Sequence, residues 1–90
     1  MKNKLIKIKN PYIKNMKEFL MDSFYYGFKL YSDYTLQKIL FYKYADVKII
    51  INLHSGLIEF EYFENNILIK LSLEDKQYLM RAFEHYVIWK

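Results

Sequence analysis

Ninety residues are enough for one small domain, and 53% of them are apolar, so a single hydrophobic core must hold the chain together. The chain has no cysteine, which excludes disulfides and thiolate metal sites and predicts a cytoplasmic protein, while its short apolar runs exclude a membrane-spanning helix. Its net charge of +4 is uneven, with nine lysines against three acids in residues 1–45 and five bases against seven acids in residues 46–90. The N-terminal half is the natural contact for an anionic partner.

The start of the chain holds its densest positive charge. Six lysines precede the first acid, Glu18: Lys2, Lys4, Lys7, Lys9, Lys14 and Lys17. From Lys4 to Lys9 apolar and basic residues alternate, which predicts a short edge strand. We therefore treat residues 1–10 as a basic N-terminal segment of one domain that spans residues 1–90.

A helix is predicted after this segment. Asn10 and Pro11 have the composition of an N-cap followed by proline at the first helical position, and apolar residues recur at helical spacing to about Tyr31. Gly27 interrupts this pattern and marks a kink, an early end or a close contact with a sheet. Residues 34–44 fit either a second helix or a strand, and we favour the helix.

Residues 47–73 predict a three-stranded antiparallel meander with turns at Ser55-Gly56 and Asn65-Asn66. A two-residue turn at the first position pairs Ile51 with Phe60 on an apolar face. The second turn keeps the same face buried and sets Glu61 opposite Lys70 on the solvent side. Both turns choose the same core-facing residues, so the sheet is the best-determined element of the sequence.

The last predicted element is a helix. Ser72 and Asp75 have the spacing of a capping box, and apolar residues at helical spacing continue to near Trp89. The predicted fold class is α+β, with the three-stranded meander, one or more N-terminal helices, and the C-terminal helix packed on one face of the sheet.

The sequence contains no motif for catalysis or for binding a cofactor. His54 and His85 lack the spacing of metal ligands, and two glycines cannot build a phosphate-binding loop. Glu59 and Glu61 lie about 7 Å apart on one strand, a spacing that glycosidase carboxylate pairs also show. Pairing of Glu61 with Lys70 in solvent gives no reason for a raised carboxylate pKa, so we expect an ordinary polar face. We expect no enzyme activity, no metal and no cofactor.

Binding is the remaining class of function. The first hypothesis is a non-catalytic module that covers a surface of a larger protein or ribonucleoprotein, with a homodimer as a further state. The expected contacts are acids of the meander and tyrosines: Glu59, Glu61, Glu64, Tyr42 and Tyr44. The composition, free of cysteine and rich in Lys, Ile, Asn and Tyr, resembles that of accessory proteins of phages and mobile elements from AT-rich bacteria. The resemblance implies an inhibitor or adaptor that blocks a host macromolecule such as a defence nuclease complex.

The alternative hypothesis comes from another class of function. It is a small nucleic-acid-binding regulator that places the six N-terminal lysines, from Lys2 to Lys17, against the phosphate backbone. Salt dependence separates the two hypotheses, because phosphate contacts weaken steeply with salt and an apolar interface does not.

Overall fold

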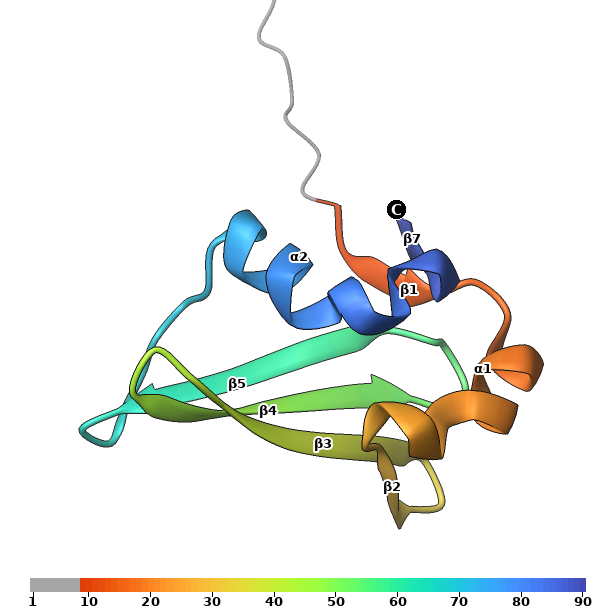
Figure 1. Ribbon diagram of the computed structural model, residues 1–90, viewed down its shortest axis with the longest axis horizontal. Helices are drawn as coiled ribbons and strands as arrows, with labels where there is room; N and C mark the ends of the chain where they lie inside the picture. The colour runs from red at the N-terminus through yellow and green to blue at the C-terminus, as the bar shows by residue number, and fades with distance from the viewer. Residues whose placement is uncertain (1–8) are drawn as a thin grey trace, which may run out of the picture.

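The computed structural model describes residues 9–90, which form an α+β fold. Its elements are β1 (Pro11–Ile13), α1 (Met16–Asp22), the 3₁₀ helix η1 (Ser23–Tyr26), β2 (Lys29–Ser32), β3 (Thr35–Tyr42), β4 (Ala45–Asn52), β5 (Ile58–Glu64), β6 (Ile67–Leu68), α2 (Leu73–Met80), the 3₁₀ helix η2 (Arg81–Tyr86) and β7 (Val87–Trp89). Five antiparallel strands form one sheet in the order β2-β3-β4-β5-β6, and β1 pairs with β7. Figure 1 shows α2 and the β1–β7 pair over one side of this sheet. The predicted fold class is confirmed, but the sheet is larger than a three-stranded meander.

The predicted helix from Pro11 to Tyr31 is wrong at both ends. Pro11 opens β1, where it pairs with Trp89, and a proline is tolerated as the first residue of a strand. The helix begins only after Asn15, whose side chain accepts a hydrogen bond from the Glu18 amide at 3.1 Å. It continues after Asp22 as η1, which ends where Gly27 takes a left-handed conformation with φ of 88°. The predicted strand at Lys4–Lys9 lies outside the described residues except for Lys9, which belongs to no strand.

Residues 34–44 contain a strand, β3, so the helix favoured by the sequence is wrong. β3 pairs with β4 over its whole length through a tight turn at Lys43 and Tyr44. Both turn residues have positive φ, 49° and 68°. Neither is the glycine or asparagine that such turns prefer, which is why the pattern gave no hairpin signal here.

The hairpin between β4 and β5 keeps the predicted buried face in a different register. Ile51 pairs with Ile58 and not with Phe60, a shift of two residues that leaves every side chain on its predicted side. The Asn52 side chain accepts hydrogen bonds from the amides of His54 and Ser55 at 2.8 and 2.9 Å. These hydrogen bonds close the five-residue connection 53–57 in place of a two-residue turn.

The third predicted strand is much shorter than expected. The turn at Asn65 and Asn66 forms with positive φ at both residues, and Phe63 pairs with Leu68 in the predicted register. β6 ends at Leu68, however, and the chain leaves the sheet toward α2. The meander predicted to reach residue 73 is therefore wrong in its last five residues.

The C-terminal helix begins as predicted and ends earlier. The capping box between Ser72 and Asp75 is present, with the Asp75 amide donating to Ser72 Oγ at 3.1 Å. The helix continues as η2 to Tyr86, and Trp89 lies in β7, so the predicted helical end near Trp89 is wrong. The amide of Lys90 donates to the Asn10 carbonyl at 3.0 Å, so strand pairing replaces the final helical turn.

The core lies between the sheet and the elements over it. From the sheet it takes side chains that alternate along the strands, such as Val47, Ile49 and Ile51, each fully buried. From the other layer it takes an aromatic cluster in which Phe19 contacts Phe28 and Phe83 with ring centroids 5.6 Å apart in each case. The remaining members of the cluster are Tyr26 and Tyr86. This packing makes the sheet a rigid base for the surface on its other side.

Candidate functional site

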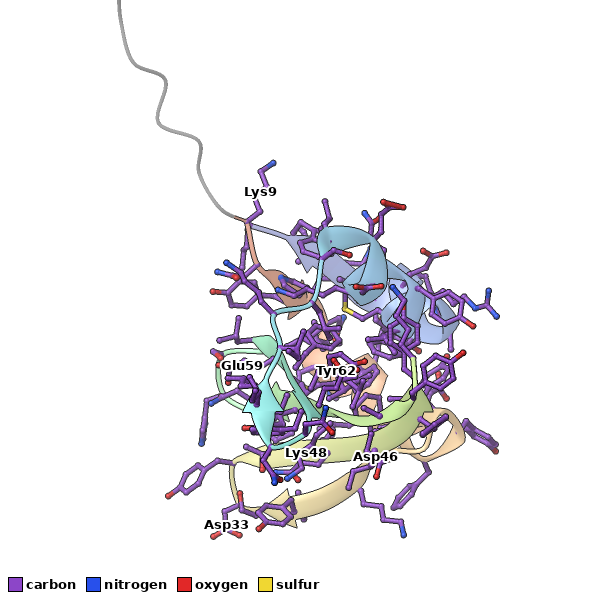
Figure 2. The ribbon with its side chains drawn as sticks, turned by 90° about the vertical axis from the view of Figure 1, so that its left-hand side faces the viewer. Lys9, Asp33, Asp46, Lys48, Glu59 and Tyr62 are labelled. Carbon is purple, nitrogen blue, oxygen red and sulfur yellow. The ribbon has the colours of Figure 1, made fainter. Side chains whose placement is uncertain are left out.

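The side of the sheet away from the core is an uncovered surface of mixed apolar and charged side chains. We call it the open face; along β3, β4 and β5 its members alternate with the buried residues, and β6 adds one more. They are Ile39, Phe41, Asp46, Lys48, Ile50, Glu59, Glu61, Phe63 and Leu68. Its four most exposed apolar side chains are between 51% and 71% exposed. In Figure 2, Asp46 and Lys48 lie toward this side, whereas Tyr62 lies between the sheet and the helices.

The strand register places charged residues next to the apolar residues of the open face. Phe63 lies opposite Leu68, and Ile39 lies opposite Lys48 on the neighbouring strand. Lys48 Nζ lies 3.9 Å from Glu61 Oε1, a loose surface pair with both side chains partly exposed. The sequence does not identify Ile39 and Phe41 as members of this surface, because its pattern over residues 34–44 favours a helix. Their alternation with Leu36 and Leu40 was the available signal.

Two of the three predicted acidic contacts share the open face, and the third lies at its edge. Glu59 and Glu61 lie on the open face, and Glu64 lies at the end of β5 opposite Ile67. The predicted pairing of Glu61 with Lys70 is wrong, because β6 ends two residues before Lys70. Asp46, Glu59 and Glu61 outnumber Lys48, so the β4–β5 part of the open face carries net negative charge. Lys29 of β2 lies in register with Gln37 on the same side of the sheet, at its other edge.

A hollow of about 650 Å³ lies where the open face meets the β3–β4 and β5–β6 turns. Ile39, Phe63, Glu64 and Asn65 are among its lining residues, and Tyr44 lies at its edge. Tyr44 is 92% exposed and holds a left-handed backbone that costs a non-glycine residue about 1–2 kcal/mol. Its exposure and its positive φ make Tyr44 a candidate contact residue at this hollow.

The surrounding structure holds this strained turn in place. The Tyr62 hydroxyl donates a hydrogen bond to the Lys43 carbonyl at 2.8 Å, and Lys43 Nζ lies 2.9 Å from Asp75 Oδ1. The Tyr42 hydroxyl also donates to Asp75. Hydrogen bonds from Lys43 first, then from Tyr42 and Ser72, hold the pKa of Asp75 well below its usual range.

Tyr42, one of the two predicted tyrosine contacts, lies on the other side of the sheet from the open face. It pairs with Ala45 in the strand register and stacks on Tyr78 of α2, with ring centroids 5.5 Å apart. The hydrogen bond to Asp75 raises the pKa of Tyr42. Its contacts tie β3 to α2 and give it a structural role.

The predicted nucleic-acid contacts are scattered over the part of the chain that the structure describes. Lys9 precedes β1, Lys14 follows it and Lys17 lies on α1, all exposed, while Lys2, Lys4 and Lys7 lie outside the described residues. These positions form no single stripe along one element. Lys9 instead borders a groove beside α2.

The described residues contain no cluster of three or more His, Asp or Glu side chains that could hold a metal ion. No helix within residues 9–90 is long and apolar enough to cross a membrane. His54 packs on Tyr34 with ring centroids 5.3 Å apart, and His85 packs on Tyr86 at 4.3 Å. Comparisons with protein-family models, with curated proteins and with solved structures find no match to the chain.

Proposed function

We propose that the protein is a small non-catalytic binding module that docks through the open face on a larger protein. The observation that carries this proposal is the set of exposed apolar side chains on one face of the sheet. Ile39 and Phe41 lie on β3, Phe63 lies on β5 and Leu68 on β6, and Asp46 and Lys48 of β4 lie between the two groups. Exposed apolar side chains gathered on one face of a sheet among charged residues are a feature of protein interfaces. Burying each such side chain stabilises a complex by about 1.5–3 kcal/mol before the cost of association.

The charge of the surface favours a different protein over a second copy of this chain. Asp46, Glu59 and Glu64 have no ion pair among the described residues, and Lys48 is already beside Glu61. Two copies packed face to face would bring acids against acids, which opposes association. A partner with basic residues around an apolar centre complements this surface.

Such a module acts by occupying a surface of its partner. With the phage-like composition, this supports an inhibitor or adaptor that covers a functional site on a host macromolecule. In a nucleic-acid enzyme that site is basic, and Glu59 and Glu61 would take positions that phosphates otherwise occupy. Simultaneous substitution of Glu59 and Glu61 by lysine then abolishes inhibition and leaves the fold intact.

The test is affinity capture with three tagged forms of the chain, washed at high salt after nuclease treatment. The forms are wild type, Phe63→Asp on the open face and Tyr25→Asp on η1, where Tyr25 is a matched exposed aromatic residue. We expect one protein in stoichiometric amount with wild type and Tyr25→Asp and none with Phe63→Asp. Equal capture by all three forms, or light scattering that shows a dimer sensitive only to Phe63→Asp, would overturn the proposal.

A further inference from the structure

A second surface feature lies on the other side of the sheet, beside α2. We call it the basic groove: a hollow of about 680 Å³ lined in part by Lys9, Lys70, Leu71, Lys76, Gln77 and Trp89. Figure 1 shows β1 and the C-terminal strand β7 side by side in the layer that also holds α2, and Figure 2 labels Lys9 at the top of this layer. The groove shares no residue with the open face.

Three segments of the chain bring their lysines to this groove. Lys9 precedes β1, Lys70 lies in the connection from β6 to α2, and Lys76 lies on α2. None of the three forms an ion pair with another described residue, and no acidic side chain lines the groove. The fold therefore holds three like charges close together without a counter-charge, an arrangement that an anionic ligand stabilises.

Trp89 supplies a flat apolar surface in the same groove. It is held by strand pairing with Pro11, and it packs partly on the core while the rest of its side chain stays accessible. Leu71, which is buried, lies beside it in the lining. Lysines spaced around a fixed aromatic ring are the combination with which proteins bind single-stranded nucleic acid, because the ring stacks on a base and the ammonium groups contact phosphates. An acidic peptide would leave the ring without a partner.

We propose that the basic groove binds a short stretch of single-stranded nucleic acid, with phosphates on Lys9, Lys70 and Lys76 and a base against Trp89. This site does not rest on the proposed protein-binding function, because it lies on the opposite side of the sheet and uses different residues. Three phosphate contacts give a slope of log affinity against log salt of about −2, since each contact to a single strand contributes about −0.7. Affinity then falls about 16-fold between about 50 and 200 mM salt.

The test uses the fluorescence of Trp89, which is the only tryptophan of the chain. Oligothymidylate of twelve nucleotides is titrated into wild type, the double variant Lys70→Gln/Lys76→Gln, and the control Lys29→Gln on β2. We expect quenching with wild type and the control, and a salt slope smaller by about 1.4 with the double variant. Circular dichroism verifies that the variants fold.

Three results would overturn this proposal. The first is absent quenching of wild type at low salt, and the second is equal affinity of wild type and the double variant. The third is equal quenching by an abasic oligonucleotide or by polyglutamate of matched charge, which would show that Trp89 stacks on no base. Each result comes from folded protein and leaves the open face unaffected.

Discussion

Two substitutions of Tyr44 in the β3–β4 turn can separate its backbone strain from its role in binding. Tyr44 has φ of 68° and is 92% exposed, so its side chain contributes little packing to the fold. Tyr44→Gly removes both the backbone strain and the aromatic ring, whereas Tyr44→Ala removes the ring and keeps the strain. Comparing the two variants isolates the backbone contribution.

The magnitude follows from two opposing effects. Relief of a left-handed conformation stabilises the glycine variant by about 1–2 kcal/mol, and the greater freedom of glycine in the unfolded chain offsets about 0.5–1 kcal/mol of it. Tyr44→Gly should therefore be about 0.5–1 kcal/mol more stable than Tyr44→Ala, which raises Tm by about 3–6 °C in a domain of this size. Both variants should bind the partner of the open face more weakly than wild type.

The assay is thermal and urea unfolding of both variants at equal concentration, followed by affinity capture. Greater stability of Tyr44→Gly with reduced capture supports the interpretation that Tyr44 is kept for contact at a cost in stability. Equal or lower stability of Tyr44→Gly relative to Tyr44→Ala would refute the strained turn. Full capture by both variants would refute the contact role.

The remaining predictions concern the fold. Phe19→Ala should lower the free energy of unfolding by about 3–5 kcal/mol in urea titrations, because the ring is fully buried in the aromatic cluster. Gly56→Ala should destabilise more than Gly27→Ala in the same assay, because the added Cβ would lie 2.9 Å from the Ile13 carbonyl oxygen, whereas at Gly27 it meets only a flexible side chain at 3.4 Å. The lowered pKa of Asp75 contributes stability that is present above the unfolded-state pKa of about 3.9 and is lost as pH falls toward the lower folded-state value. Wild type should therefore lose its advantage over Asp75→Asn between about pH 5 and pH 2 in thermal scans, and a constant difference would contradict this assignment.

The sequence predicts those elements whose local chemistry agrees with their tertiary environment. Asn65-Asn66 forms its turn in the predicted register, and Ser72 with Asp75 forms the predicted capping box. The buried face of β4 and β5 is also as predicted, because a register shift of two residues leaves each side chain on the same face of the sheet. In each case the nearby residues alone decide the conformation.

The failures occur where distant contacts override local preference. Pro11 begins a strand because β7 pairs with it, a partner 78 positions away in the chain. The β3–β4 turn is held by Tyr62 and Asp75, so its own residues carry no turn signal. The basic groove was not predicted, since its lysines and Trp89 come from segments that only the fold brings together.

Site-specific photocrosslinking in the cells that naturally express the protein tests the role of the open face most directly. A benzophenone amino acid replaces Phe63 on the open face or, in the control, Tyr25 on η1, both of which are exposed. We predict one adduct of defined mass from position 63, with a protein other than this chain, and none from position 25. Adducts from position 25 alone, or none from position 63, would contradict the proposal that the open face is the protein-binding surface.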